Sequence, residues 1–396
     1  MSTARRTKRR TAPGSVDEMA VAVPRVLVVT NDFPPRVGGV QQYVWNLVRR
    51  LPADRVAVLA PNWPGWREHD GAHSFPIYRW PSTFVWPTTE LARRVRCLVK
   101  EHGADVVLFG HGFPLPLLVP GLRERATPSV ILTHGAEVWL ARSPGFSGAM
   151  RRAFAAAREV TAVSQYTARV LRPLVPASVS FSLMPPAIDA ERFSPSADGS
   201  AVRRRLGIED RVTIVCVSRL VPRKGQDTLI RAMALLRSLV PDAVLLVVGN
   251  GPYRTRLEAL AAEAPAGSVA FAGEVADDEL PSFHAAGDLF AMPCRSRWGG
   301  LEVEGFGIVF LEAAGVGRAV VAGRSGGAGE AVEDETTGLL VEGGEPKAVA
   351  LAITRLLRDP DLMARMGAAG RARVEASFTW DARAQQLTDV LRRAAG

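Results

Sequence analysis

Short apolar runs alternate with amphipathic helical patterns along most of the chain. In the first half, nearly continuous apolar runs lie at residues 25–32, 55–61, 105–110, 129–135 and 159–164. Such runs are typical of strands that are buried on both faces of a parallel sheet. Helical patterns such as VQQYVWNLVRRL separate several of them, which predicts a parallel, doubly wound sheet.

The same alternation begins again after a polar segment rich in proline, glycine and serine, ERFSPSADGS at residues 191–200. This composition is typical of a linker between domains. The strands that we expect beyond it lie at residues 212–218, 243–251, 268–273, 289–294, 319–323 and 338–341. The sequence therefore predicts an α/β protein in which two doubly wound domains face each other across a cleft.

Ligands of open α/β sheets bind at the carboxyl ends of the strands, so the residues that follow each strand are candidates. Gly38 and Gly39 follow the first strand and come just before a helix N-terminus, a place that favours an anion. An ordinary tight turn explains them equally well. His134 follows the run SVILT and could bind a substrate or move a proton, although a lone histidine is more often structural.

Cations follow the first strand of the second half. Arg219 and Lys224 are five residues apart in RLVPRKG, and two fixed cations at a strand end suit a diphosphate. A solvated basic loop is the alternative, and Arg223 is a less certain third charge. Gly249 lies at the next strand end, where glycine again allows the backbone to approach a ligand closely.

The segment VEGFGIVFLE at residues 303–312 is the richest in candidate chemistry. Glycines precede an apolar run that predicts a buried helix, with Glu304 near its start. Glu312 comes about two turns later and near the same face, because eight residues advance a helix by roughly 800°. Glu304 could simply cap the helix. Glu312 needs a partner within an apolar helix, and either a ligand hydroxyl or a buried arginine would serve.

Asp359 and Asp361 form an Asp-x-Asp pair, a pattern that can hold a divalent metal ion. Proline between them, at the first turn of a helix, makes helix capping the better explanation. We therefore expect no catalytic metal. The three cysteines have no metal-ligand spacing and fit reduced thiols in a cytosolic enzyme.

The chain has a net charge of +9, which suits nucleic acid, an anionic membrane or phosphorylated small molecules. No signature of a nucleic-acid-binding motif is present, so nucleic acid is the weakest of the three. Residues 1–22 are basic with no apolar run behind them, which predicts a disordered tail and not a secretory signal.

The segment LARRVRCLVKEH at residues 91–102 places four cations among apolar residues at helical spacing. An amphipathic basic helix can lie on anionic lipid. The alternative is an outer helix of the sheet with a solvated face. The net basic chain favours the membrane interpretation.

Several motifs together resemble a known family. Glu304 and Glu312 give the pattern E-x7-E, and with PPRVGGVQ, SRLVPRKGQDTLI, VVGNGPYRTRLE and PPAIDAERFSP they resemble the retaining glycosyltransferases of family GT4, which have the GT-B fold. The resemblance covers about residues 25–380. TNDFPPRVGGVQQY and AMPCRSRWGGLEVEGFGIVFLEA are closest to the actinobacterial α-1,6 phosphatidylinositol-mannoside mannosyltransferases, which use GDP-mannose.

This resemblance implies a division of the chain. Residues 23–195 would form a Rossmann-like acceptor domain, and residues 200–378 a Rossmann-like domain for the nucleotide-sugar donor. The last segment, residues 379–396, would be a helix that crosses back to the first domain.

The resemblance also implies roles for the candidate residues. Arg219 and Lys224 would bind the donor diphosphate, and Glu312 the ribose. Glu304 would hold a hydroxyl of the transferred sugar, and His134 would contact that sugar. Further donor contacts would come from the loop of Gly38 and Gly39, from Gly249, and from the backbone of Gly305, Phe306, Gly307 and Ile308. Asp32 and Gln41 would face the acceptor.

The expected function is transfer of mannose from GDP-mannose to a phosphatidylinositol mannoside or related glycolipid, without a metal. The expected location is the cytoplasm, peripheral on the inner face of the membrane. The same chemistry with another nucleotide sugar and a soluble sugar- or inositol-phosphate acceptor is the main alternative. A GT-B epimerase, a phosphorylase and a non-catalytic nucleotide-sugar binding protein are weaker ones.

Overall fold

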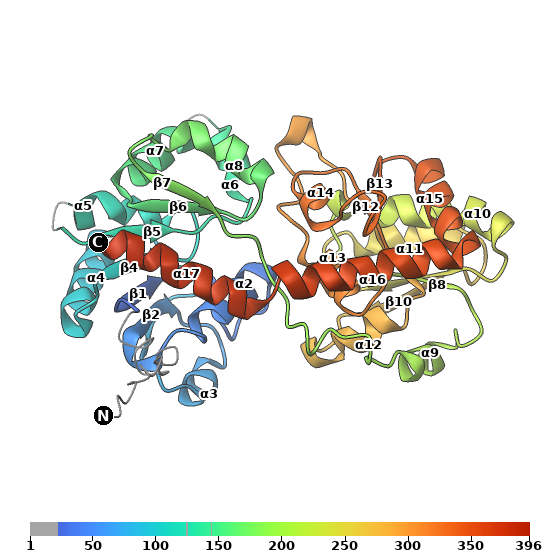
Figure 1. The fold of residues 1–396 in the computed structure, drawn as a ribbon, viewed down its shortest axis with the longest axis horizontal. Coiled ribbons are helices and arrows are strands. Elements are labelled where there is room, and N and C mark those ends of the chain that lie inside the picture. The colour runs from blue at the N-terminus through green and yellow to red at the C-terminus, as the bar shows by residue number, and fades with distance from the viewer. Residues whose placement is uncertain (1–22, 124–125, 144) are drawn as a thin grey trace, which may run out of the picture.

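The computed structural model describes residues 23–396 except 124–125 and 144. The basic tail expected at residues 1–22 lies outside the described residues. The described chain forms two lobes, and each contains a parallel sheet between layers of helices (Figure 1).

Within the described residues, the first sheet has seven parallel strands in the order β3-β2-β1-β4-β5-β6-β7. The strands are β1 (Val26–Val29), β2 (Val56–Pro61), β3 (Ile77–Trp80), β4 (Val106–Phe109), β5 (Ser129–Ile131), β6 (Glu159–Ala162) and β7 (Ser180–Leu183). Five of them match the apolar runs. The sequence did not predict β3 and β7, because both are edge strands whose side chains are only partly buried.

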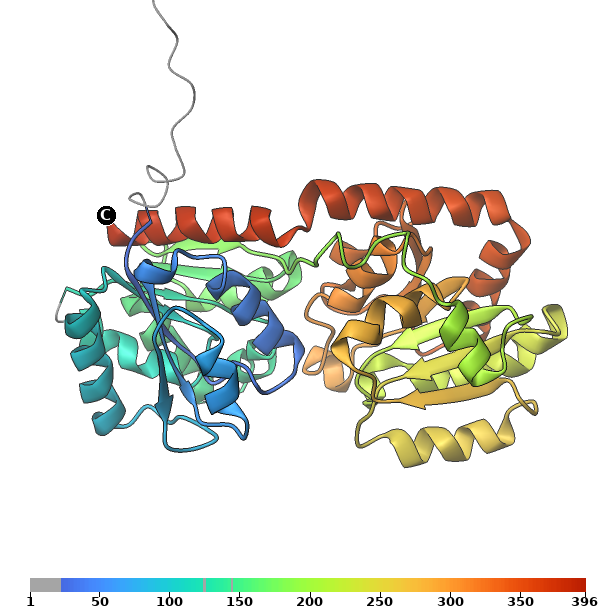
Figure 2. The same cartoon turned by 90° about the horizontal axis from the view of Figure 1, so that it is seen from below.

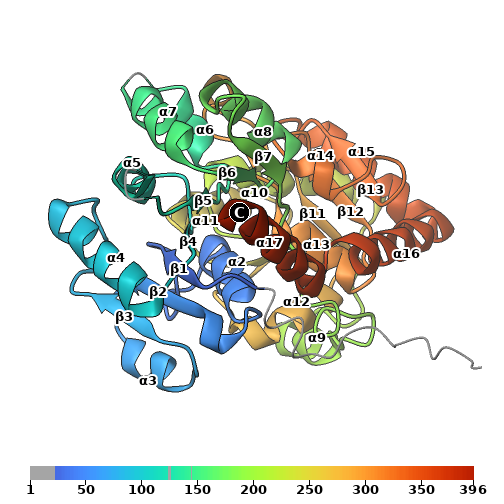
Figure 3. The ribbon, with the colours of Figure 1, turned by 60° about the vertical axis from the view of Figure 1, so that its left-hand side comes forward.

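Helices cover both faces of this sheet: α2 (Gly39–Val48), α3 (Trp66–Gly71), α4 (Thr89–His102), α5 (Val119–Arg123), α6 (Glu137–Ala141), α7 (Phe146–Ala156) and α8 (Gln165–Leu171). One core lies under α2, and the other lies under α4, α5 and α7 on the opposite face (Figure 3). In α4, Leu91, Val95 and Leu98 are fully buried in the second core. The apolar stripe of α4 is therefore used for packing on the sheet, and only its basic face is exposed.

The second sheet has the order β10-β9-β8-β11-β12-β13, and all six strands match predicted runs. They are β8 (Thr213–Val217), β9 (Val244–Val248), β10 (Val269–Gly273), β11 (Leu289–Met292), β12 (Val320–Gly323) and β13 (Gly338–Val341). The helices of this lobe are α9 (Ser200–Leu206), α10 (Gln226–Leu239), α11 (Arg254–Glu263), α12 (Leu280–Ala285), α13 (Ile308–Gly315), α14 (Ala328–Ala331), α15 (Pro346–Arg358) and α16 (Pro360–Ser377). The Asp359 side chain accepts a hydrogen bond from Leu362 N at the start of α16, so the predicted helix cap is confirmed.

The last helix, α17 (Trp380–Ala395), leaves the second lobe and packs on α2 of the first, as expected (Figure 2). Trp380 is buried against the Tyr43 ring, with 5.8 Å between the ring centroids. Near the other end, Arg393 forms an ion pair with Glu159 of β6 at 2.7 Å. The outgoing chain passes beside the returning one, where Ile188 N donates to Phe378 O. The chain therefore crosses between the lobes twice, and the two crossing segments lie side by side.

We expect Trp380→Ala to lower the free energy of unfolding by about 3–5 kcal/mol, because it removes a buried aromatic side chain and leaves a cavity. Urea unfolding followed by circular dichroism measures this. Leu351→Ala, at a half-exposed position on α15, is the control and should change the value by less than about 0.5 kcal/mol. Equal unfolding curves for both variants would show that α17 does not stabilise the first lobe.

Candidate functional site

The two lobes meet through backbone atoms at one point of the cleft. His134 and Gly135 follow β5, and Gly305 lies just before α13. A Cβ atom on Gly305 would lie 2.6 Å from His134 O, and one on Gly135 would lie 2.8 Å from the Gly305 Cα atom. Only glycine fits at both positions. The contact brings the His134 segment of the first lobe beside the Glu304 segment of the second.

Glu304 is a buried carboxylate between two cations. Its Oε2 atom lies 2.7 Å from Lys224 Nζ and 2.7 Å from Arg223 Nη1, and the residue is 6% exposed. Burial alone would raise the pKa of the Glu304 carboxyl, but Lys224 and Arg223 outweigh it and hold the pKa below its ordinary value. Arg223, the less certain cation of the sequence, therefore belongs to this cluster.

The expectation that Glu304 and Glu312 share one helix face is wrong. The helix α13 begins at Ile308, so Glu304 lies in the loop before it. Gly307 is the N-cap residue and has a φ of 91°, a left-handed conformation that favours glycine. No described side chain caps α13, so the capping explanation of Glu304 also fails.

The segment from Gly305 to Ile308 joins Glu304 to α13, and its Gly305 backbone contacts the first lobe. The Phe306 side chain is buried and packs on Phe378, with ring centroids 5.7 Å apart. The first N–H groups of α13 receive no cap from any described side chain. Uncapped amides at a helix N-terminus are suited to bind an anion. This arrangement fits the role that the resemblance gives the segment.

Glu312 lies on the second turn of α13. Its Oε2 atom is 3.2 Å from Nε2 of His284, a fully buried residue of α12. The intramolecular partner is thus a histidine, which neither sequence alternative named. Glu312 also lines a cavity of about 230 Å³ between the lobes. The cavity walls are Gln42, Trp45, Asn46, Arg49, Ala187, Ile188, Asp189, Arg192, Phe193, Asp277, Ile308, Glu312 and Trp380.

The other candidates for binding the donor are two cations, Arg219 and Lys224, and one glycine, Gly249. Arg219 follows β8 with an exposed side chain, so it can meet a ligand. Lys224 ends the 3-10 turn Pro222–Lys224 and points to Glu304. Gly249 follows β9, and a Cβ atom there would overlap the Ser218 carbonyl. Backbone packing alone therefore explains the glycine at position 249.

The loop after β1 leads into α2 through Gly38 and Gly39. No described side chain caps α2, so its first amides are also suited to an anion. A Cβ atom on Gly38 would overlap Oε1 of Gln41, whereas one on Gly39 would meet nothing within 4 Å. The Gln41 side chain is buried and donates from Nε2 to Asp32 Oδ1 at 2.6 Å. Gln41 thus orients Asp32, which keeps more exposure.

His111 and Glu137 are two residues of this region that the sequence analysis missed. His111 follows β4, and its Nδ1 atom lies 3.3 Å from Asp32 Oδ2. Burial lowers the pKa of His111, although Asp32 and Glu137 oppose that shift. Burial therefore favours the neutral imidazole. The strand-end rule that selected His134 could have found His111 too.

Glu137 ties two strand ends together. Its buried carboxylate accepts hydrogen bonds from the backbone N–H groups of Gly112, His134 and Gly135, at 2.9–3.0 Å. The His134 ring adds a bond from Nε2 to Gly110 O at 2.7 Å and packs against Tyr43. With Nε2 engaged, Nδ1 is the ring nitrogen left to meet a substrate. No sequence motif signals Glu137, because its three partners come from two loops.

Within the described part of the chain, no group of three or more histidine, cysteine or acidic side chains is arranged to hold a metal ion. The described helices also include none that is long and apolar enough to cross a membrane.

Both lobes match glycosyltransferase family models. Residues 37–192 match the model described as Glycosyltransferase Family 4, and residues 200–373 match Glycosyl transferases group 1. The chain resembles the crystal structure of HepE from Anabaena in complex with UDP, with a TM-score of 0.76 and 24% identity over 93% of this chain and 99% of that one. That likeness supports the GT-B fold alone.

Two relatives are similar over nearly their whole length. The GDP-mannose-dependent α-(1-6)-phosphatidylinositol monomannoside mannosyltransferase of Mycobacterium tuberculosis is 44% identical over 93% of this chain and 98% of its own. The corresponding enzyme for the monoacylated lipid from Corynebacterium glutamicum is 39% identical over 93% and 98%. The chain therefore belongs to the GT-B glycosyltransferase family of these mannosyltransferases.

Proposed function

We propose that this protein transfers mannose from GDP-mannose to a phosphatidylinositol mannoside or a related glycolipid, with retention at the anomeric carbon. The identity to mannosyltransferases along 93% of the chain supports the donor and the acceptor class. The backbone contact between Gly135 and Gly305 supports the chemistry, because it places His134 beside the Glu304 cluster.

The donor diphosphate would lie between the uncapped N-termini of α2 and α13, beside Arg219. Negative charge grows on the leaving phosphate as the bond to mannose breaks, and fixed amides and cations stabilise that charge without rearranging. Lys224 is held next to Glu304 by their ion pair, so one cluster can serve both the phosphate and a hydroxyl of the sugar. A leaving phosphate oxygen then takes the proton of the acceptor hydroxyl on the same face of mannose, and no metal is needed.

The nucleoside would occupy the cavity that Glu312 lines. A carboxylate accepts hydrogen bonds, and ribose offers two hydroxyl donors. Asp277 is a second acceptor on the same cavity wall. Ile308 supplies an apolar surface there, which is common in nucleotide pockets.

The acceptor would approach from the first lobe, where Asp32 lies between Gln41 and His111. Asp32 can accept a hydrogen bond from a sugar hydroxyl. A soluble sugar- or inositol-phosphate acceptor is not favoured, because the relatives that match 93% of the chain are named for lipid acceptors.

We further propose that the protein works in the cytoplasm, peripheral on the inner face of the membrane. The exposed cations of α4 support attraction to anionic lipid. The apolar residues of α4 are buried in the sheet, so this helix contributes charge and does not insert.

GDP should raise the melting temperature by about 3 °C at a hundredfold excess over its Kd, because it binds the native state alone. UDP and ADP at the same concentration should give smaller shifts. Glu312→Ala should weaken the shift with GDP by removing the ribose acceptor. A larger shift with UDP or ADP would contradict the choice of donor.

Glu304→Gln should lower kcat/KM for transfer by about 100-fold, because the neutral amide no longer holds Lys224, Arg223 and the sugar hydroxyl in place. Initial rates with labelled GDP-mannose measure this. Glu209→Gln, at an exposed acid beyond α9, is the matched control. A retained melting shift with GDP would show that the variant is folded, and full transfer by that variant would disprove the role of Glu304.

Products should appear in the lipid extract of a cell membrane supplied with GDP-mannose. Mass spectrometry of the lipid and aqueous extracts should find one added hexose on a phosphatidylinositol mannoside. A hexose added to a water-soluble phosphate instead would identify the alternative acceptor class. Turnover of GDP-mannose without any acceptor would indicate an epimerase.

A further inference from the structure

We propose that His284, a buried residue of α12, positions the carboxylate of Glu312 and thereby sets how strongly the enzyme selects ribose in its donor. His284 touches no substrate itself, so it is a positioning residue that acts through Glu312. The inference rests on the proposed function, which places the nucleoside in the cavity that Glu312 lines.

The contact between the two residues is a buried hydrogen bond. Nε2 of His284 lies 3.2 Å from Oε2 of Glu312, and the two side chains are 0% and 13% exposed. An ionised carboxylate can only accept, so Nε2 carries the hydrogen. Among the described residues, no other side chain donates to the Glu312 carboxylate. A buried carboxylate is costly without a partner, and His284 is that partner.

Glu312 joins this histidine to the nucleoside cavity. A carboxylate has two oxygens with about four lone-pair sites, and His284 engages one oxygen. Oε1 has no hydrogen-bond partner in the described part of the chain. Ile308 lies one turn earlier in α13 and lines the same cavity of about 230 Å³, so this side of the helix faces the cavity. The free oxygen is therefore available to a hydroxyl of ribose.

The imidazole ring of His284 is held by aromatic neighbours. It packs on Phe193 and on Phe290 of β11, with ring centroids 5.9 Å and 5.5 Å apart. Phe193 is itself part of the cavity wall, so His284 lies in the layer behind that wall. Close packing on two rings restricts rotation of the imidazole. The direction in which Nε2 donates is therefore fixed before a donor binds.

The main chain that carries Glu312 is fixed as well. A Cβ atom on Gly315 would lie 2.9 Å from Phe193 O, so α13 packs closely on the chain that crosses between the lobes. Arg371 of α16 donates from Nη1 to Phe193 O at 2.6 Å and to Gly315 O at 2.9 Å. With the helix fixed, the rotatable bonds of the Glu312 side chain are the freedom that remains. His284 restricts them, and a preorganised acceptor binds its ligand at a smaller entropic cost.

The other ring nitrogen indicates that His284 does more than fill space. Nδ1 is buried and has no hydrogen-bond partner among the described residues. A buried polar atom without a partner lowers stability, and a phenylalanine would fill this space without that cost. The bond from Nε2 to Glu312 is the feature that a polar side chain supplies here. The histidine therefore serves the carboxylate and not the core.

Comparison of GDP with 2′,3′-dideoxy-GDP tests this role, because the dideoxy nucleotide lacks both hydroxyls of ribose. Titration calorimetry gives the Kd of each, and the ratio of the two Kd values measures the selection of ribose. Wild-type protein should bind GDP about 30-fold more tightly, which is typical of a hydrogen bond to a charged group. His284→Phe should lower the ratio to about threefold or less, because the carboxylate loses its fixed orientation. A histidine that only joined α12 to α13 would change stability and leave this ratio unchanged.

Two amide substitutions of His284 form a matched pair. The amide nitrogen of glutamine reaches the place of Nε2, whereas that of asparagine reaches only the place of Nδ1. His284→Gln should therefore keep the ratio within about threefold of wild type, and His284→Asn should lower it as His284→Phe does. Both variants bury an amide, so a general effect of polarity or lost packing would appear in both. Equal ratios in the two amide variants would overturn the inference.

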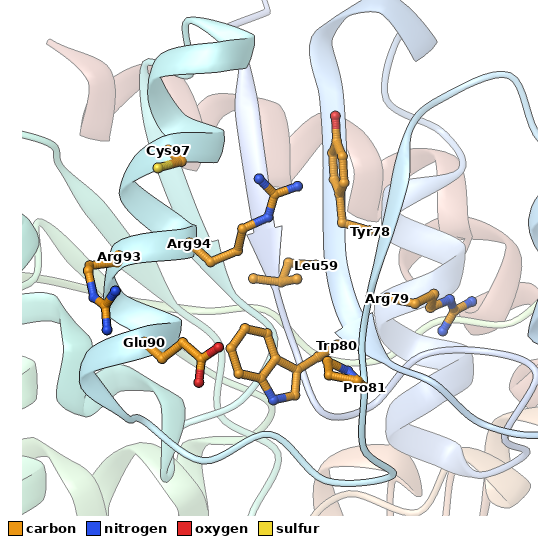
Figure 4. A pocket seen from close by; sticks show the side chains of 9 residues that line it. All are labelled: Leu59, Tyr78, Arg79, Trp80, Pro81, Glu90, Arg93, Arg94 and Cys97. Carbon is orange, nitrogen blue, oxygen red and sulfur yellow. The ribbon is translucent and has the colours of Figure 1, made fainter.

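A control histidine lies in the first lobe. Nε2 of His102, at the end of α4, lies 2.7 Å from the Tyr78 hydroxyl, and Tyr78 lines a groove of about 500 Å³ between α4 and β3 (Figure 4). This groove is on the face of the first sheet opposite to α2, whose residues line the nucleoside cavity. His102→Asn removes a comparable bond and should leave the ratio within about twofold of wild type.

Glu312→Ala shows whether His284 acts through the carboxylate. Alone it should remove the selection of ribose, and adding His284→Phe should change the ratio no further, because no carboxylate remains to be positioned. A further loss in the double variant would overturn the inference.

Nitrogen NMR of labelled histidine tests the hydrogen bond in the unmodified protein. The signal of His284, assigned by its loss in His284→Gln, should show a hydrogen on Nε2. An Nε2 atom without hydrogen would overturn the inference, because it could not donate to Glu312.

Steady-state transfer separates this inference from the proposed function. His284→Phe should raise KM for GDP-mannose about tenfold and leave kcat within about threefold, since the ribose contact is the same in the ground state and the transition state. Equal ratios in wild type and in folded His284→Phe, with the mannosylated lipid still made, would overturn the role of His284 and leave the function standing. Selection of ribose that is lost in His284→Phe, in a protein that makes no mannosylated lipid, would support that role and overturn the function.

Discussion

The buried ion cluster of Glu304, Lys224 and Arg223 is the constraint on which the site depends. A buried carboxylate is costly unless it is paired, and here two cations from the loop after β8 approach one oxygen. The pairing fixes the segment before α13, and that segment carries Gly305 to the contact with Gly135. Local electrostatics in the second lobe therefore set where the first lobe can dock.

In the first lobe, the buried carboxylate of Glu137 holds the backbone near this contact. Glu137 accepts three backbone N–H groups and so holds the loops after β4 and β5 in one arrangement. His111 and His134 sit on those two loops. A substitution of Glu137 would thus disturb His111 and His134, although Glu137 forms no hydrogen bond with either imidazole ring. The site is built from backbone held by buried carboxylates on both sides of the cleft.

The sequence predicted what depends on local pattern. Continuous apolar runs identified the interior strands of both sheets, and the strand-end rule located His134, Arg219 and Lys224. The sequence did not predict features that depend on exposure to solvent or on contacts between separate elements. The edge strands β3 and β7 lack continuous burial, and Gly307, the N-cap residue with a φ of 91°, starts α13 only after Glu304. The partners of Glu312 and Asp32 lie on other elements, with His284 on α12, Gln41 on α2 and His111 on the loop after β4, so no single spacing could reveal them.

The sequence pattern of α4 fits two interpretations, and the packing of the helix distinguishes them. Its amphipathic spacing suits both an interfacial helix and the outer layer of a sheet, since each needs one apolar face. The core uses that face completely, with Leu91, Val95 and Leu98 fully buried. Insertion of α4 into a bilayer would expose the core that this helix covers, so the outer face of α4 can contribute only its charge.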